Sequence, residues 1–131
     1  MDDLDVNAAI GRQFLEALAG QDWHAMRQLF SDDAHWTMPG SNSIFSATAV
    51  GPDTLVARAQ GIAASGVHTE VLHVLVGHAG VALSLHNTAQ NASGQRLDQH
   101  LATVLTIKHG KIAKVDTYLS DVAGMETFFS S

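Results

Sequence analysis

The sequence predicts an α+β fold: a cone-shaped barrel in which three N-terminal helices pack on a curved, mostly antiparallel β-sheet of about four to six strands and enclose an apolar pocket. The chain has 131 residues, of which 46% are hydrophobic, and this suits one domain spanning residues 1–131. Its first half shows helical periodicity, whereas residues from 69 onward show strand patterns. A twisted sheet covered by helices commonly leaves a pocket inside.

Three helices are expected in the first half of the chain. Apolar residues within 6–19 recur at steps of three and four, which places them on one helix face, and Gly20 ends this helix. Asp22 can cap a second, short helix because its carboxylate accepts hydrogen bonds from free backbone N–H groups. Residues 51–53 (Gly-Pro-Asp) start a third helix that continues to about Ala64, since proline is tolerated in the first turn.

Strands dominate the second half. A first short strand at residues 34–38 stops at Pro39-Gly40, because proline cannot donate to a strand ladder. Glycine-containing turns then divide the chain into a four-strand antiparallel meander, and a short amphipathic helix closes it. The meander strands are expected at residues 69–77, 81–89, 97–108 and 112–119, and the closing helix at 122–129.

Charge and cysteine content exclude several classes of function. Seven Lys and Arg against thirteen Asp and Glu give a net charge of −6, the wrong sign for binding nucleic acid or anionic lipid. Without cysteine, the chain has no disulfide scaffold, thiolate zinc site or cysteine nucleophile. Residues 1–6 are acidic and show neither a secretory signal nor a membrane span. We therefore expect a soluble cytoplasmic protein with no nucleic-acid or membrane partner.

Three segments of the chain resemble the SnoaL-like branch of the nuclear transport factor 2-like superfamily. They are residues 30–40 (FSDDAHWTMPG), the Gly51-Pro52 helix start, and residues 109–121 with their HGKI and YLSD motifs. The resemblance covers nearly the whole chain and implies one apolar pocket. This superfamily includes ketosteroid isomerases, polyketide cyclases, limonene epoxide hydrolases, dehydratases and non-catalytic binders. The resemblance is therefore more specific for the fold than for the chemistry.

The sequence departs from two of these enzyme designs. The general base of ketosteroid isomerases is an aspartate just before the proline that ends the first strand, and Met38 stands there. Phe14 stands where these enzymes have the tyrosine that donates to the oxyanion, so steroid isomerisation is disfavoured. Limonene epoxide hydrolases hold an arginine between two aspartates inside the pocket. The arginines of this chain fit that role poorly, because they lie on predicted helices or beside a loop: Arg12, Arg27, Arg58 and Arg96.

The polyketide cyclase design leaves one candidate acid/base pair. A two-residue turn at His109-Gly110 pairs the last two strands so that His100 and Asp121 become neighbours at the end of the pocket. A carboxylate beside an imidazole can orient one tautomer and raise its basicity, which suits proton transfer near neutral pH. We predict Asp121 and His100 as catalytic residues. Two alternatives stay open: Asp121 caps the closing helix, or a one-residue bulge reverses the strand faces.

The same pairing predicts the residues that bind a substrate. Two residues of the first strand lie two positions apart, share a face, and form an apolar wall with one aromatic residue of the first helix. Three residues of the last two strands face them. The predicted substrate-binding set is Phe14, Trp36, Met38, Val104, Thr117 and Leu119.

No metal site and no cofactor are expected. His68, His73 and His78 follow one another at five-residue steps and so alternate between the faces of an extended strand. His73 and His86 could share a face of one hairpin, but no H-x-H or H-E-x-x-H pattern occurs. The glycines in residues 77–80 lie between strands rather than at a helix start, so no site for NAD, FAD or ATP is visible.

Two functions remain open from the sequence. One is a cofactor-independent acid/base enzyme of the cyclase, isomerase or lyase (dehydratase) kind that acts on a small hydrophobic carbonyl compound. The other is a non-catalytic small-molecule-binding domain with the same pocket; an epoxide hydrolase is a weaker third alternative. A homodimer formed through the sheet is also expected, because one sheet face has more apolar surface than water favours. That face is predicted to bear Leu101, Thr103, Leu105 and Tyr118.

Overall fold

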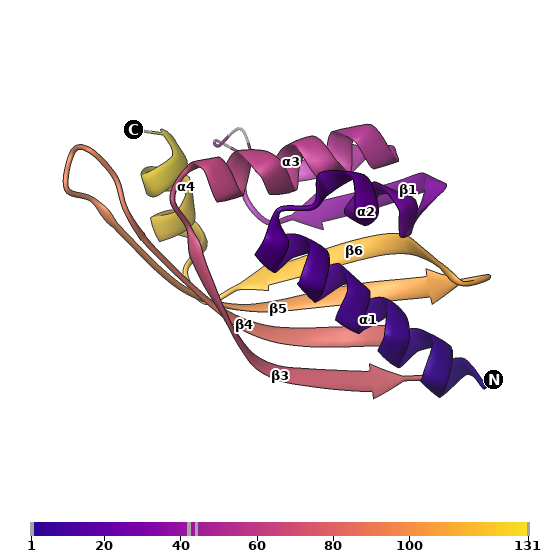
Figure 1. Cartoon of the computed structure of the whole chain (residues 1–131). Coiled ribbons are helices and arrows are strands. Elements are labelled where there is room, and N and C mark those ends of the chain that lie inside the picture. The colour runs from indigo at the N-terminus through magenta and orange to yellow at the C-terminus, as the bar shows by residue number, and fades with distance from the viewer. Residues whose placement is uncertain (1, 42, 44, 131) are drawn as a thin grey trace.

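The computed structural model describes residues 2–41, 43 and 45–130. Three helices and two strands precede the four-strand meander, and a fourth helix closes the chain (Figure 1). The helices are α1 (Asp3–Gly20), α2 (Trp23–Gln28), α3 (Pro52–Ala64) and α4 (Val122–Ser130). The strands are β1 (Phe30–Met38), β2 (Ala47–Val50), β3 (His68–Gly77), β4 (Gly80–Gln90), β5 (Arg96–Lys108) and β6 (Lys111–Leu119). Within the described residues, no helix is long and apolar enough to cross a membrane.

The helix starts follow the predicted chemistry. The Asp22 carboxylate accepts a 3.0 Å hydrogen bond from the Ala25 backbone N–H and so caps α2. Asp2 caps α1 in the same way. Gly51 has a φ of 93°, a left-handed conformation that favours glycine, and proline follows it as the first residue of α3. The sharp turn from β2 into α3 therefore depends on the Gly-Pro pair.

The six strands form one curved sheet in the order β2-β1-β6-β5-β4-β3. The pairing of β1 with β6 is parallel, and the other neighbours are antiparallel. Figure 1 shows α1 crossing in front of the sheet and α3 lying beside β1, with α4 at the end toward which the sheet bends. The predicted α+β class, with its helices on a curved and mostly antiparallel sheet, is confirmed.

The hydrophobic core lies between the helices and one face of this sheet, which we call the inner face; the opposite one is the outer face. Helices α1 and α3 supply apolar residues that are less than a tenth exposed, as their helical period predicts. Alternate residues of the strands meet them. The buried residues on the two sides include Ile10, Phe14, Leu55 and Ala59 from the helices and Val81, Leu83, Leu105, Ile112 and Val115 from the strands.

The pairing of β5 with β6 corrects the predicted register. The tight turn pairs Lys108 with Lys111 and Ile107 with Ile112 as expected, but Thr106 then pairs with Lys114, which leaves Ala113 as an extra residue. This bulge leaves Thr117 and its alternate neighbours on the inner face of β6, as predicted, and reverses the faces of β5. The prediction was therefore wrong for β5: its inner face bears Leu97, Gln99, Leu101, Thr103 and Leu105, and its outer face bears Asp98, His100, Ala102 and Val104.

The bulge has a physical cause. If β5 kept the predicted faces, the charged Asp98 and the imidazole of His100 would be buried while several leucines faced water. One unpaired residue in β6 lets both strands bury their apolar sides. The same reversal removes Leu101, Thr103 and Leu105 from the face predicted to form a homodimer, and leaves Tyr118 there, 64% exposed.

Candidate functional site

A cavity of about 380 Å³ lies between the inner face of the sheet and helices α1, α3 and α4. This volume is within the range of small-molecule sites. Its wall is mostly apolar and comes from every layer of the fold. Representative lining residues are Leu18 from α1, Ile62 from α3, Leu85 and Leu101 from the sheet, and Met125 and Phe129 from α4.

A row of hydrogen-bonding groups crosses the floor of this cavity. The indole Nε1–H of Trp36 in β1 donates to Thr117 Oγ1 in β6 at 2.9 Å, and the Thr117 and Thr103 hydroxyls lie 3.3 Å apart. All three side chains are at most 8% exposed and all line the cavity. Three neighbouring strands thus place one polar row in an apolar wall.

The number of hydroxyl hydrogens in this row shows whether it can donate a further hydrogen bond. Thr117 accepts from Trp36, and a single hydrogen is shared between the two threonine hydroxyls, whichever of them donates. Two hydroxyls carry two hydrogens, so one remains to donate to a molecule in the cavity. Because both threonines line the cavity, the row can offer this hydrogen to a molecule bound there.

A second donor lies at the β3–β4 side of the cavity. The Thr69 hydroxyl donates a hydrogen bond to Asn87 Oδ1 at 2.6 Å. The oxygen of the Asn87 amide is thus used, and its nitrogen is left to donate elsewhere. Both residues line the cavity. In the part of the chain that the structure describes, the Asn87 amide nitrogen has no hydrogen-bond partner. It is available to a bound molecule.

The cavity contains little that can titrate. Among the described residues that line it there is no carboxylate, lysine or arginine, and the single titratable side chain is His68 at the start of β3. His68 is exposed. The wall therefore suits binding of a neutral molecule more directly than it suits acid/base chemistry.

Arg58 is a structural residue of this site that sequence reasoning passed over. It lies on the buried side of α3, 8% exposed, where its guanidinium donates to the carbonyl oxygens of Trp36 at 2.9 Å and Ser46 at 3.0 Å. The guanidinium carbon lies 5.4 Å from the centroid of the Trp36 ring, and burial lowers the pKa of Arg58 below its usual value. Arg58 therefore fixes both the backbone and the ring of Trp36.

A signal for Arg58 was present in the sequence. It comes three residues after Leu55 and one before Ala59, both of them buried on the same side of α3. An arginine on the apolar face of a helix needs buried acceptors, and strand backbone carbonyls provide them here.

Five of the six residues predicted to bind a substrate line the cavity, and one does not. The lining ones are Phe14, Trp36, Met38, Thr117 and Leu119, and their contact with a substrate stays a prediction. Val104 is on the outer face because of the bulge in β6. Gln99 and Thr103 line the cavity instead and were missed, since the predicted register turned β5 the other way; Asn87 of β4 also lines it and was not predicted.

The predicted catalytic pair does not form. His100 is exposed on the outer face, where its ring stacks on that of His86 at a centroid distance of 4.4 Å. Asp121 Oδ1 accepts from the Gly124 N–H at 2.9 Å, which is the capping role left open as an alternative. Neither side chain lines the cavity. The Asp121 backbone instead exchanges two hydrogen bonds with the Gln99 amide, which ties β5 to the start of α4.

Comparisons with known proteins agree with this architecture. The family model of the SnoaL-like domain matches residues 11–115. The uncharacterized protein Rv0034 of Mycobacterium tuberculosis (strain ATCC 25618 / H37Rv) is 27% identical over 132 residues, which cover 98% of each chain. The structure of Bal32a, from a soil-derived mobile gene cassette, is similar with a TM-score of 0.87 and 25% identity, over 98% of this chain and 99% of that one.

A further solved structure is similar in fold and comes from a co-crystallisation with a small molecule. TerC co-crystallised with polyporic acid matches with a TM-score of 0.80 and 12% identity, over 96% of this chain and 99% of that one. At this identity the likeness concerns the fold alone. Because the family model matches residues 11–115, which is most of the chain, the chain belongs to the SnoaL-like domain family.

Proposed function

We propose that this protein binds a small hydrophobic molecule that carries an acceptor oxygen, such as a carbonyl group, in the cavity between the helices and the inner face. The observation that carries the proposal is the wall itself: about 380 Å³ of mostly apolar lining, with hydrogen-bond donors at the Thr103–Thr117 pair and at Asn87, and no carboxylate, lysine or arginine among the described lining residues. Burial of the apolar body supplies affinity, and the donors orient the oxygen. TerC, which has a similar fold, was crystallised with polyporic acid, and this supports the ligand class without assigning it.

The direction of the hydrogen bonds favours a ligand with an acceptor oxygen, such as a carbonyl, over a ligand that offers only donors. The spare hydroxyl hydrogen of the Thr103–Thr117 pair and the Asn87 amide both donate. A ligand that offers only donors would leave these hydrogens unpaired in a dry wall, which is costly. A ligand with one carbonyl oxygen satisfies at least one of them.

The proposal is tested with two matched pairs of probes: 9,10-anthraquinone against anthracene, and androst-4-ene-3,17-dione against androstane. Quenching of tryptophan fluorescence reports binding, because Trp36 lines the cavity. We expect the carbonyl member of at least one pair to bind about 10-fold more tightly than its hydrocarbon, the worth of one good hydrogen bond. Equal affinity within both pairs contradicts the role given to the donors.

A cavity-filling variant locates the binding. Ala63→Phe adds a ring inside the cavity, whereas Ala64→Phe adds the same ring at a neighbouring exposed position outside it. We expect Ala63→Phe to weaken binding of the tighter probe by about 10-fold or more and Ala64→Phe to leave it unchanged. Melting temperatures of both variants check that the fold persists. Equal affinity of wild type and Ala63→Phe would show that the probe binds elsewhere.

The acid/base alternative depends on His68, the one titratable side chain lining the cavity among the described residues. A general base near a bound ketone would exchange the hydrogens next to its carbonyl for deuterium in D2O. Nuclear magnetic resonance follows this exchange in wild type and in His68→Gln. Exchange faster than in buffer, and lost in His68→Gln, favours a cofactor-independent isomerase or cyclase. Tight binding without exchange favours the non-catalytic binder.

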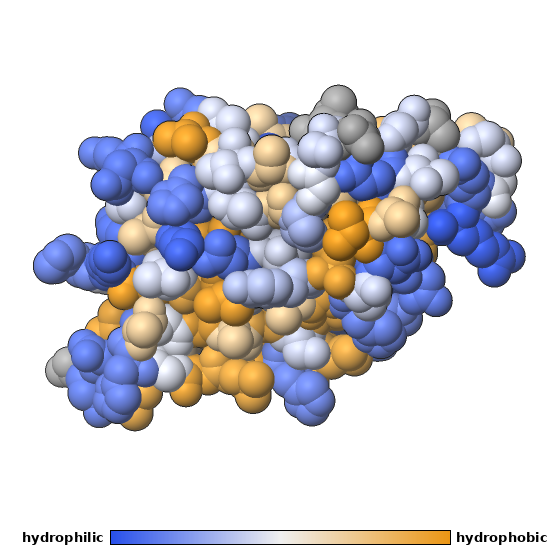
Figure 2. Space-filling view, turned by 180° about the vertical axis from the view of Figure 1, so that it is seen from behind, coloured by the Kyte–Doolittle hydropathy of each residue, from blue (hydrophilic) through white to orange (hydrophobic). Residues whose placement is uncertain are grey.

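We also propose that two copies associate through the outer face of the sheet. Several large apolar side chains are exposed there, and Figure 2, which shows the molecule from behind, has hydrophobic surface gathered over the lower part of the sheet. A two-fold symmetric contact would cover such a patch on both copies at once. The exposed outer-face residues that support this are Leu75 in the edge strand β3 and Tyr118 in β6; Val50 is exposed at the opposite edge, in β2.

A further inference from the structure

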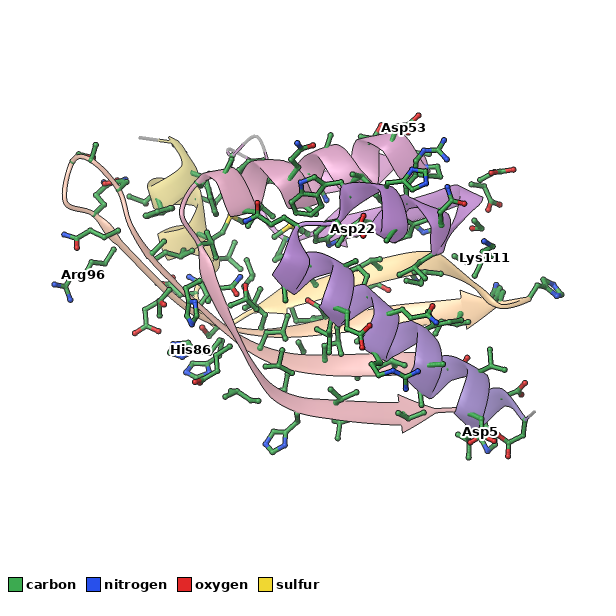
Figure 3. All side chains as sticks on the ribbon, viewed as in Figure 1. Asp5, Asp22, Asp53, His86, Arg96 and Lys111 are labelled. Carbon is green, nitrogen blue, oxygen red and sulfur yellow. The ribbon has the colours of Figure 1, made fainter. Side chains whose placement is uncertain are left out.

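A second cluster of chemically active side chains lies on the outer face, away from the cavity. His86 in β4 is directly opposite His100 in β5, and Asp98 is two residues before His100 on the same side of that strand. His86 Nε2 lies 2.6 Å from Asp98 Oδ1, and the two imidazole rings are parallel within 3°. One ligand atom from each of the three residues lies within 4.8 Å of the others. Figure 3 shows His86 where the strands twist toward the β4–β5 turn, apart from the helices.

We propose that His86, Asp98 and His100 bind one divalent transition-metal ion of the Zn²⁺ class. Imidazole nitrogen with carboxylate oxygen suits Zn²⁺, Cu²⁺, Ni²⁺ or Fe²⁺, whereas Mg²⁺ and Ca²⁺ prefer sets made entirely of oxygen. Three protein ligands leave at least one position of the ion to water or to an external ligand. The site is independent of the ligand proposed for the cavity.

Rotation of the three side chains is enough to bring their ligand atoms to the distances of a metal site. Zinc bonds of about 2.1 Å to nitrogen and oxygen place the ligand atoms of a tetrahedral site about 3.4 Å apart. In the structure, one pair of ligand atoms is 2.6 Å apart and all three lie within 4.8 Å of one another. Asp98 and His100 are exposed and His86 is half-buried, so their side chains can turn without repacking the core. The continuous β4–β5 ladder meanwhile fixes the backbone positions.

Without an ion the cluster is incompletely paired. Asp98 contacts one imidazole, that of His86, and the ring of His100 stacks on the ring of His86. An ion shared by all three groups would give each of them an attractive partner. Glu70, opposite His86 on β3, adds negative charge beside the site, while Arg96, two residues before Asp98, adds positive charge.

The ion would also act on the cavity wall from behind. Leu85 and Asn87 flank His86 in the chain, and Gln99 and Leu101 flank His100; all four line the cavity from the other side of the same strands. An ion held between β4 and β5 therefore clamps the two strands that carry these lining residues. Since it binds the folded chain and not the same residues in an unfolded one, Zn²⁺ should raise the melting temperature.

The test is a titration of protein without a polyhistidine tag, using Zn²⁺ in isothermal calorimetry. Variants His86→Gln and His100→Gln remove a ligand each, and His109→Gln removes a histidine at an exposed turn outside the cluster. We expect wild type to bind one Zn²⁺ per chain and the cluster variants to bind at least about 10-fold more weakly. His109→Gln should bind like wild type, and the rise in melting temperature with Zn²⁺ should be lost only in the cluster variants.

A spectroscopic measurement on the wild-type protein tests the metal site without any substitution. Cu²⁺ added at equal concentration should show, by electron paramagnetic resonance, coupling to nitrogens of two imidazoles. Coupling to fewer than two overturns the proposal. An equal loss of Zn²⁺ affinity in His109→Gln and His100→Gln, or unchanged affinity in the cluster variants, also overturns it.

Discussion

Arg58 carries a full charge on the side of α3 that packs against the sheet. Its guanidinium bonds to two backbone carbonyl oxygens and lies over the Trp36 ring, whose N–H continues to Thr117. One chain of contacts thus links α3, β1 and β6 behind the cavity. At the scale of single residues, the Trp36 indole is therefore held by this arginine and by Thr117 in addition to its apolar packing.

Replacing Arg58 should therefore destabilise the fold. Arg58→Met keeps the apolar stem and leaves the carbonyls of Trp36 and Ser46 without their donor, which should cost about 2–4 kcal/mol of unfolding free energy. Urea unfolding followed by fluorescence measures this. The control is Arg27→Met, which breaks an exposed ion pair with Asp53 and should change stability little. Similar losses in both variants would contradict the structural role of Arg58.

At the scale of the elements, two irregular positions determine how β4, β5 and β6 lie against one another. Ala113 is the bulged residue that reverses the faces of β5, and Gly80 opens β4 directly against the backbone of β5. A Cβ at Gly80 would overlap the Leu105 carbonyl oxygen. A Cβ at Gly77, on the other side of the same hairpin, would meet no neighbouring atom within 4 Å. Two glycines of one turn thus have different roles.

The two glycines give a matched experiment on this hairpin. Gly80→Ala should lower the unfolding free energy by about 2–4 kcal/mol, because a backbone carbonyl cannot move aside as a side chain can. Gly77→Ala should leave it near the wild-type value. Thermal and urea unfolding of both variants measure the difference. Equal unfolding free energies of the two variants would contradict this prediction, because they would mean that β4 and β5 can move apart to admit the Cβ at little energetic cost.

At the scale of the whole molecule, the sheet has two faces with different tasks. The inner face closes the core and cavity, and the outer face exposes apolar residues together with the His86, Asp98 and His100 cluster. Both proposals for the outer face therefore concern one surface. A second copy and a metal ion can each change how that surface behaves, so they need separate tests.

Sedimentation at micromolar concentration tests the proposed dimer. We expect a species of about twice 13.9 kDa for wild type, and a shift toward the single chain for Tyr118→Arg, since burying an unpaired charge in the contact is costly. Leu4→Arg, a change at an exposed apolar residue of α1, should leave the dimer intact. Wild type that sediments only as one chain rules out this assembly.

The sequence by itself determined the class of fold, the order of the helices and meander strands, the family resemblance and part of the apolar cavity wall, namely Phe14, Trp36, Met38 and Leu119. These features depend on local periodicity and on turn residues such as Asp22 and Gly51-Pro52, which act over a few neighbouring positions. The family match and the caps agree with them.

Only the tertiary structure decided which side of β5 faces the cavity. A single bulged residue moves a whole strand's side chains to the opposite face, and its position follows from the burial balance of two strands together rather than from any local pattern. That one event separated His100 from the cavity and placed Gln99 and Thr103 in it. The register of β4 against β5, which also exists only in the folded sheet, brings His86, Asp98 and His100 together across two strands, a grouping that no spacing within one segment could reveal.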